Sequence, residues 1–215
     1  GYSKIDREMP SRMLISELMI MANSLMAEFL KNHNMPAVFR SQAEPKQRLF
    51  KGIEPSLLMN MMQKRQLSRV VISTDPESHS GLAVKAYVTA TSPIRRYYDL
   101  LTQRQLKAIL GFHEPYTKTE LDDILMGIST IVTASNRVQA LRKRYWIIKY
   151  LESRKGTSLE ALVLEHHREN YLILIKEFML EAKLQLGAIR LQNGDVIRVT
   201  VQHADARRNL LSFCL

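Results

Sequence analysis

The nine residues from Thr91 to Asp99, TSPIRRYYD, combine residue types that can hold a phosphate group. Ser92 is a preferred N-cap residue and Pro93 a preferred first helical residue, so a helix is predicted to begin here. The start of a helix presents unpaired backbone N–H groups and the positive end of the helix dipole. Arg95 and Arg96 add two fixed cations in the predicted first turn. The segment therefore predicts an anion site.

A plainer interpretation is that Ser92 and Pro93 only cap a helix and that both arginines are solvated. One detail favours the anion site. Cations at the positive end of a helix are disfavoured by about a few tenths of a kcal/mol or more, so two arginines there indicate an anion that offsets the repulsion. Asp99, four residues after Arg95, can supply part of that offset within the helix.

A long helix is predicted over residues 10–32, ahead of this segment. Its apolar residues recur every three or four positions, which indicates one buried face. Glu17 falls on that stripe, and a buried carboxylate needs a partner, in either a structural ion pair or a functional site. The stripe comprises Leu14, Leu18, Met21, Leu25 and Phe29.

The middle of the chain alternates between breaks, helices and short extended pieces. Residues 34–45 break the first helix and contain Arg40. Helices are predicted over 55–66 and 120–152, the second with a break near Gly127, and the signature helix should stop near Gly111. Extended pieces are predicted at 70–73 and 84–88, around a loop at 74–81. The basic end of the last helix could contact RNA or simply be solvated.

After Gly156 the period changes from helical to alternating, which predicts four or five short antiparallel strands. That number of strands in about 60 residues is typical of a small OB-type barrel, a fold that binds single-stranded nucleic acid. Tyr171 and Phe178 are the aromatic candidates for base stacking, although both could be core residues.

Composition favours a polyanion partner. The chain has 215 residues and a formal net charge of +10, and residues 1–153 hold 22 Lys/Arg against 14 Asp/Glu. Such a surplus attracts RNA without specifying its sequence. The sequence shows no signal peptide and no apolar run approaching the roughly 18 residues of a membrane span, so no membrane is expected. The single Cys214 fits a reducing, cytoplasmic location.

Three motifs closely resemble those of the ribonuclease II and ribonuclease R (RNB) family of 3′-to-5′ exoribonucleases. They are TSPIRRYYD followed by LLTQRQLKAIL, the helix SRMLISELMIMAN, and the link PAVFRSQAEP, in the order that the family has them. Gln42 and Gln103 stand where the family often has histidine. Glutamine cannot act as an acid or base, so both positions are expected to be structural.

The resemblance implies a magnesium-dependent enzyme that hydrolyses single-stranded RNA to nucleoside 5′-monophosphates. In that scheme Arg95 contacts the scissile phosphate and Glu17 positions the terminal nucleotide, as the two catalytic residues. Asp99 and Asn23 are expected to hold the site residues in position without contacting the RNA themselves. The expected RNA-binding residues are Thr91, Ser92, Arg96, Tyr97 and Arg40.

The family's cluster of metal-binding aspartates precedes the glutamate helix, and no such cluster is visible in this sequence. Asp122 and Asp123 are adjacent but fit a solvated helix face. We therefore expect a C-terminal portion of a longer enzyme, inactive alone, with Mg²⁺ held mostly by residues outside this chain and the N-terminal half of the nuclease domain as its partner.

The predicted fold class is α+β, in two domains. Residues 1–153 would form the mainly helical C-terminal half of an RNB nuclease domain, and 154–215 a small antiparallel OB-type barrel that binds RNA. A monomer is expected. Two alternatives stay open, a non-catalytic RNA-binding module and a helical adaptor for a protein partner.

Overall fold

The computed structural model describes residues 9–185, 187 and 189–215, which form two compact units. The first unit contains the described residues up to Arg48 together with Gln66–Thr130. The second contains Leu49–Arg65 and Ile131–Leu215. Each unit is described by itself. The second unit thus includes a segment from the first third of the chain, whereas the division at residue 153 stays a prediction.

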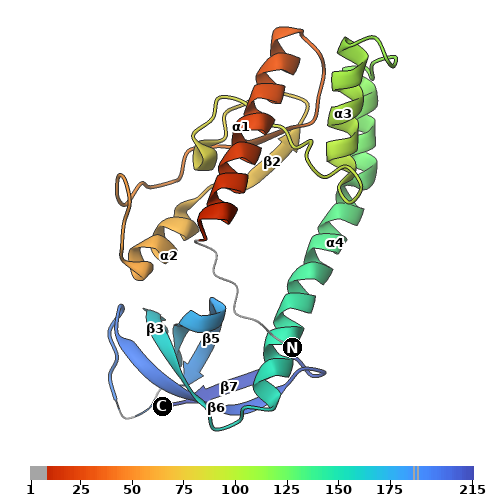
Figure 1. Cartoon of the computed structure of the whole chain (residues 1–215). Helices are drawn as coiled ribbons and strands as arrows, with labels where there is room; N and C mark the ends of the chain where they lie inside the picture. Colours follow the sequence, from red (N-terminus) through yellow and green to blue (C-terminus); the bar gives the residue numbers. More distant parts are fainter. Residues whose placement is uncertain (1–8, 186, 188) are drawn as a thin grey trace. The chain divides into compact units, whose positions relative to one another are not determined.

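Helices surround a small two-stranded sheet in the first unit (Figure 1). In the sheet, β1 pairs antiparallel with β2, with Phe39 opposite Ser73. The predicted helix over 10–32 and the extended piece at 70–73 are confirmed, and α3 ends just before Gly111 as expected. The elements are α1 (Pro10–Asn32), β1 (Phe39–Gln42), β2 (Val70–Ser73), η1 (Ser80–Leu82), α3 (Tyr97–Ile109) and the first part of α4 (Lys118–Glu152).

The buried face of α1 is not the predicted one. Ala27 and Leu30 pack with Phe39 and Val88 in the core, and Asn23 is buried one turn earlier. The predicted stripe is exposed instead, with Leu14 61%, Leu18 49%, Met21 54% and Leu25 58% accessible. Glu17 lies on this exposed side, so the prediction of a buried carboxylate is wrong. Helical periodicity identifies an apolar face but not the element that covers it.

By length and composition alone, α1 could also cross a membrane, which the sequence analysis did not expect. Core helices of soluble proteins pass the same test. In the first unit α1 packs through Ala27 and Leu30, and its Ser24 hydroxyl donates a hydrogen bond to the carbonyl of Ala86 at 3.3 Å.

The long helix α4 runs from Lys118 to Glu152 without the predicted break at Gly127. Glycine inside a helix costs only about 1 kcal/mol relative to alanine, so the surrounding helix formers outweigh it. Near the start of α4, Asp122 accepts a hydrogen bond from the Thr74 hydroxyl at 2.7 Å, and Lys118 pairs with Asp75 at 2.6 Å.

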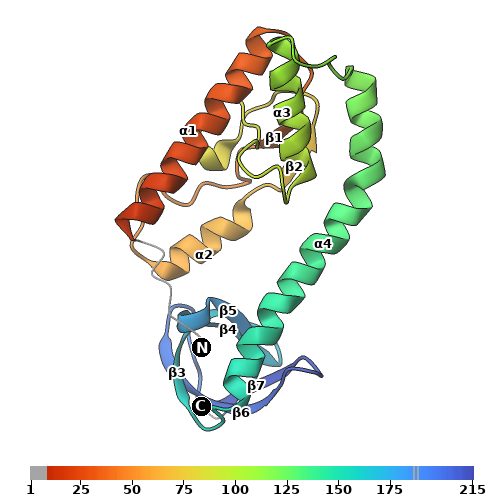
Figure 2. The same ribbon diagram turned by 45° about the vertical axis from the view of Figure 1, so that its right-hand side comes forward.

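The second unit is a closed five-stranded barrel with α2 (Leu57–Gln66) packed beside it (Figure 2). The strand order is β3-β4-β5-β7-β6. Four of the neighbouring pairs are antiparallel, but β5 and β7 close the barrel in parallel, with Leu184 opposite Phe213, so the all-antiparallel prediction is wrong. The elements are β3 (Ser158–His166), β4 (Asn170–Ile175), η2 (Lys176–Phe178), β5 (Leu180–Gln185), β6 (Val196–Asp205) and β7 (Leu210–Cys214).

Strand β3 is buried on both faces. Val163 joins the barrel interior, while Leu162 and Leu164 join a second cluster with Met61 of α2. Arg65 at the end of α2 pairs with Glu165 of β3 and, at 3.5 Å, with Glu181 of β5. The helix is therefore attached to the barrel by both apolar and ionic contacts.

The two aromatic candidates for base stacking belong to the barrel core. Tyr171 is only 3% exposed, and its hydroxyl accepts a hydrogen bond from the backbone N–H of Leu191 at 3.1 Å. Phe178 packs edge-on against Tyr150 at a ring distance of 5.7 Å. Tyr171 is thus a core residue, and Phe178 packs on the same core.

Candidate functional site: an arginine loop held by buried polar groups

The TSPIRRYYD segment folds as a turn followed by a helix that starts later than predicted. The carbonyl of Ser92 accepts hydrogen bonds from the N–H groups of Arg95 at 3.3 Å and Arg96 at 3.1 Å, which closes a tight turn. Arg96 is then extended (φ −132°, ψ 112°) and is the N-cap of α3, which begins at Tyr97. Ser92 therefore closes the turn rather than capping the helix, and both arginines precede the helix.

Asp99 holds this loop together from beneath. Its carboxylate is fully buried and accepts a hydrogen bond from the backbone N–H of Ser92 at 2.8 Å. The Arg96 Nε lies 3.3 Å from the same carboxylate oxygen, Oδ2. Asp99 also sits in the first turn of α3, where a negative charge complements the helix dipole. The predicted partner was Arg95, whereas the observed partner is Arg96, because the extended Arg96 backbone turns that side chain toward Asp99.

Arg95 is left on the surface of the loop. It is exposed, and its Nη2 is 3.4 Å from the Ser92 hydroxyl, a long and weak contact. Thr91 and Tyr97 are exposed on either side of it, Tyr97 by 45%. The two neighbouring arginines therefore differ, since Arg96 pairs with a buried acid whereas Arg95 is exposed on the surface of the loop.

The entry to the loop is fixed at Ala90 by one side chain from each of two helices. The Asn23 Oδ1 of α1 accepts a hydrogen bond from the Ala90 N–H at 3.2 Å, and the Gln103 amide of α3 donates to the Ala90 carbonyl at 2.7 Å. Asn23 also donates to the Tyr87 hydroxyl at 3.1 Å. Both backbone groups of the residue before Thr91 are thus satisfied by buried or half-buried amides.

Gln42 and Gln103, expected to be structural, both bond to backbone. The Gln42 amide donates to the Ser68 carbonyl at 2.8 Å. Its Oε1 also lies 2.3 Å from the position that a Cβ on Gly81 would take, so a larger residue there would have to displace the Gln42 amide. These contacts confirm the structural role expected for the two glutamines.

Arg40 lies on β1 beside a histidine that the sequence analysis did not single out. The Arg40 N–H donates to the Tyr87 carbonyl at 2.8 Å, and the His79 ring packs edge-on against the Tyr87 ring at 5.8 Å. Burial, and secondarily the nearby Arg40 charge, lower the pKa of His79. Among the described residues, His79 Nδ1 and Arg40 Nε are buried without a hydrogen-bond partner. His79 lies in the segment that the sequence predicted as a loop. Its burial is visible only in the structure, where the side chain is 6% exposed.

Glu17 is not joined to this cluster. It is exposed on α1, and among the described residues it makes no hydrogen bond or ion pair with Arg95, Arg96 or Arg40. The described part of the chain also contains no group of three or more His, Cys, Asp or Glu side chains that could hold a metal ion. The first unit therefore joins the arginine loop to Asn23 through Ala90, and Asn23 and the Arg40 backbone both bond to Tyr87.

Fold and site together define a chain with two parts, a helical unit that presents an exposed arginine on a loop held by a buried acid, and a closed β-barrel. The profile of the RNB domain matches residues 2–111, about half of the chain. The chain therefore belongs to the RNB family.

An uncharacterized ribonuclease of Synechocystis is 29% identical over 94% of this chain and 31% of its own length. The chloroplastic and mitochondrial ribonuclease II of Arabidopsis thaliana is 29% identical over 93% of this chain and 26% of its length. The chain thus spans about a third or less of the length of these curated relatives.

Solved structures share the fold. An active-site mutant of the exoribonuclease Dss1 from Candida glabrata has a TM-score of 0.78 at 23% identity, covering 95% of this chain and 28% of that one. Ribonuclease R of Mycoplasma genitalium bound to ribose-methylated single-stranded RNA has a TM-score of 0.71 at 17% identity, covering 94% and 41%. Yeast Ssd1, described as a pseudonuclease, has a TM-score of 0.63 at 20% identity, covering 86% and 28%.

Proposed function

We propose that this chain acts within a longer 3′-to-5′ exoribonuclease that hydrolyses single-stranded RNA to nucleoside 5′-monophosphates. The observation that carries the proposal is the exposed Arg95 on a loop that buried Asp99 and Ala90 contacts hold in place, in a member of the RNB family. Two relatives with ribonuclease names support the reaction class.

In this proposal Arg95 binds the scissile phosphate. A guanidinium can hold two phosphate oxygens at once and can stabilise the negative charge that develops on them in the transition state. The loop geometry supports this role because, within the described part of the chain, the Arg95 guanidinium makes only the long contact to Ser92, so its donors are available to a ligand. Arg96 acts mainly through Asp99, which fixes the shape of the loop.

The other candidate residues have supporting roles in RNA binding. Thr91 and Tyr97 flank Arg95 on the exposed surface of the loop, and Ser92 closes the turn beneath it. Arg40 supplies a further cation from β1. Glu17 remains proposed for the terminal nucleotide on the strength of the family motif alone, since its exposed position on α1 places it beside apolar residues.

Magnesium stays a prediction from the family resemblance. Mg²⁺ takes oxygen ligands, usually one or two carboxylates with phosphate and water. The described residues offer no group of three potential ligands, so they do not fit a metal centre of their own. Any catalytic magnesium would be held by carboxylates outside this chain.

The exposed side of α1 supports the proposed partner, the N-terminal half of the same nuclease domain. Leu14, Leu18, Met21 and Leu25 form an apolar face along about three turns of α1. Such a face on one helix is normally covered by another element.

Three further proposals concern the protein as a whole. It is a monomer, it is not attached to a membrane, and it is located in the cytoplasm. The barrel is proposed to be an RNA-binding barrel of the OB type, and its strand order and the parallel pairing of β5 with β7 support the OB type.

The decisive experiment measures release of mononucleotides from uniformly labelled single-stranded RNA by the longer nuclease. Arg95→Ala should lower kcat by about 100-fold or more, as removal of one transition-state donor typically does. Lys107→Ala, which removes an exposed cation from α3, is the matched control and should leave the rate unchanged. A rate for Arg95→Ala within about threefold of wild type, under roughly 1 kcal/mol of barrier, would show that the assigned role is wrong.

A second candidate function is a non-catalytic RNA-binding module. It is favoured by the similarity to a yeast pseudonuclease and by the lack of a metal-binding group among the described residues. The two candidates separate in one assay. A nuclease releases mononucleotides in Mg²⁺ and stops in EDTA, whereas a binding module holds the RNA intact under both conditions.

A further inference from the structure

An apolar stripe on α4 is left uncovered by the described residues of the second unit. Ile131 is 68% exposed, Val138 62% and Leu141 51%, and Ala134 and Tyr145 are exposed as well. These five residues, called the α4 stripe below, recur at alternating intervals of three and four. That spacing places them on one side of the helix over two heptads, at the a and d positions of a coiled coil.

The barrel holds the end of α4 and so fixes the helix that carries the stripe. Ile148 and Leu151 are fully buried in the barrel core. Ile148 follows Tyr145 by three residues, so the buried face and the α4 stripe are one continuous face of the helix. Beyond them, Glu152 accepts a hydrogen bond from the N–H of Ala206 at 2.6 Å. A partner would therefore meet a helix that is already formed and anchored.

The side chains that flank the α4 stripe are cations. In heptads that start with Ile131 at position a, Arg137 and Arg144 fall at g and Arg142 falls at e. Side chains at e and g form the ion pairs between the helices of a coiled coil and determine which partner is accepted. Arg144 also donates a hydrogen bond to the Asn209 side chain at 2.7 Å, but this neutral acceptor does not compensate its charge.

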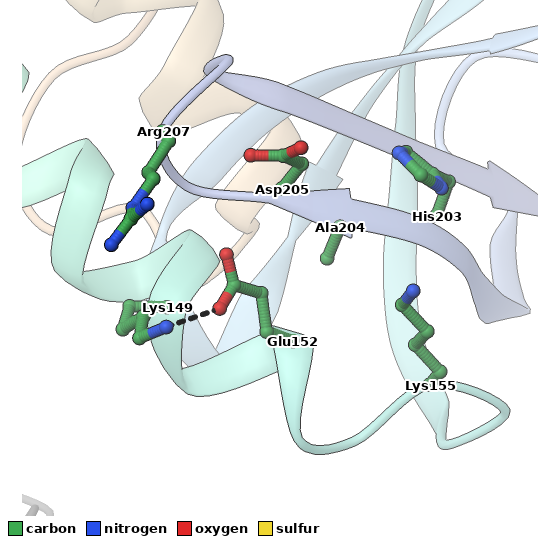
Figure 3. Close-up of a pocket in the computed structure, with 7 residues that line it drawn as sticks. All are labelled: Lys149, Glu152, Lys155, His203, Ala204, Asp205 and Arg207. Carbon is green, nitrogen blue, oxygen red and sulfur yellow. Dashed lines mark hydrogen bonds and ion pairs between the residues drawn. The ribbon is translucent and has the colours of Figure 1, made fainter.

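Nearby acids do not neutralise these arginines. The sequence has no Asp or Glu between Asp123 and Glu152. Glu152 lines a hollow beside β6 and pairs there with Lys149 at 2.6 Å (Figure 3). In the part of the chain that the structure describes, Arg137 and Arg142 are exposed and make no ion pair or side-chain hydrogen bond. Their charges are therefore available to a partner.

The chemistry of the stripe selects one kind of occupant. RNA bases stack on flat rings, which the aliphatic Ile131, Val138 and Leu141 do not offer. A second copy of this chain is disfavoured, because arginines at both e and g would face like charges in either helix orientation. An acidic amphipathic helix satisfies both features, since its apolar residues pack on the stripe and its carboxylates meet the arginines. A β-branched residue at a with Leu at d favours such a two-stranded pairing.

We propose that the α4 stripe is a docking surface for an acidic amphipathic helix of another protein. The partner helix carries apolar residues at its own a and d positions and Glu at e and g, where they pair with Arg137, Arg142 and Arg144. Two heptads bury little surface, so the complex is transient, with a Kd of about micromolar. This inference goes beyond the proposed nuclease function and does not depend on it.

The probe is a fluorescein-labelled three-heptad peptide with Leu at a and d and Glu at e and g. A second peptide with Lys at e and g is its counterpart. Anisotropy with the 215-residue chain should show binding of the Glu peptide and not of the Lys peptide. The binding should weaken as salt rises, because exposed charges are screened.

Two pairs of substitutions separate the α4 stripe from the apolar side of α1. Val138→Ser/Leu141→Ser should weaken binding of the Glu peptide by about tenfold or more, as loss of central apolar contacts does. Leu18→Ser/Met21→Ser, which removes two exposed apolar residues from α1, is the matched control and should bind as wild type does. Equal losses in the two pairs would overturn the assignment to α4.

Charge reversal tests the choice of partner. Arg137→Glu/Arg142→Glu should lose the Glu peptide by about tenfold or more and gain the Lys peptide, because repulsion then excludes the former partner. Circular dichroism checks that each variant is folded. Absence of Glu-peptide binding in wild type, or equal binding of both peptides, would overturn the proposal.

Two further outcomes would assign the surface to a different occupant. Tighter binding of oligoadenylate than of the Glu peptide, lost in Arg137→Glu/Arg142→Glu and kept in Val138→Ser/Leu141→Ser, would make it an RNA surface. Binding of the Glu peptide by the 215-residue chain but not by the longer nuclease would show that another part of the same protein covers the stripe. Either result would contradict docking of a separate protein.

Discussion

The carboxylate of Asp99 lies beneath the loop that it organises, and it accepts a hydrogen bond from the backbone N–H of Ser92, seven residues earlier, at 2.8 Å. The same carboxylate pairs with Arg96. This one buried acid therefore fixes the turn between Ser92 and Arg96 and determines which arginine points outward.

Asp99→Ala should destabilise the first unit, because it leaves the Ser92 N–H and the Arg96 guanidinium without their acceptor. The expected loss is about 1–3 kcal/mol, the usual penalty for an unpaired buried donor. Asp99→Asn keeps an oxygen acceptor for Ser92 but not the charge, and should cost less. Chemical unfolding followed by circular dichroism measures both, and equal stability of wild type and Asp99→Ala would contradict this account of the loop.

Gln103 should matter through its hydrogen bond to the Ala90 carbonyl. Gln103→Leu removes the donor and leaves that half-buried carbonyl unpaired, at a cost of about 1–3 kcal/mol. Gln103→His restores a ring N–H donor and should recover part of that loss. Thermal unfolding compares the three proteins. A histidine variant no more stable than the leucine variant would argue that the amide acts by packing alone.

His79 should make stability depend on pH. Its pKa is lowered in the folded state by burial and by Arg40, so between the folded and unfolded pKa values the unfolded chain binds more protons. The neutral His79 ring therefore makes its full contribution to stability when the pH is above the pKa of the unfolded state, about 6.5. That contribution is lost as the pH falls through the lower pKa of the folded state.

His79→Phe keeps a ring against Tyr87 and removes the titration. Its Tm should fall less than that of wild type between about pH 7.5 and pH 5.5. His33→Phe is the control, since His33 is exposed on the end of α1 and should leave the wild-type difference in place. Parallel pH profiles for wild type and His79→Phe would contradict the assignment.

The barrel should depend on α2. Met61 packs against Leu162, Leu164 and Leu174, which would otherwise be an apolar patch on the outside of the strands. Met61→Ala is expected to cost about 2–5 kcal/mol, the range for deleting a buried methionine side chain. Residues 154–215 expressed alone should aggregate or bind a hydrophobic dye, and a soluble, dye-free barrel would show that the helix is dispensable.

Without the N-terminal half of the nuclease domain to cover it, the apolar side of α1 should make the isolated 215-residue chain self-associate, whereas the longer nuclease is proposed to be a monomer. Leu18→Ser/Met21→Ser replaces two residues of that side that are 49% and 54% exposed, so it should lower dye binding and association without lowering Tm. Ala27→Ser on the buried side is the opposite control and should lower Tm. Sedimentation velocity reports the association, and unchanged association in the double variant would contradict the proposed docking face.

The sequence by itself determined the features that depend on local pattern. The RNB motifs identified the family, the 3.6-residue period located α1, and the alternation after Gly156 predicted the barrel strands. The charge surplus and the two arginines of the signature also pointed to a phosphate ligand before any contact was known.

The tertiary structure decided which of several equivalent residues performs each role. Only the extended backbone at Arg96 shows that Arg96, and not Arg95, pairs with Asp99. Only long-range contacts reveal that His79 is buried beside Tyr87 and that α1 buries Asn23, Ala27 and Leu30 rather than its more apolar stripe. The physical reason is that periodicity records the preference of a residue for burial, whereas the partner that satisfies it comes from a distant part of the chain.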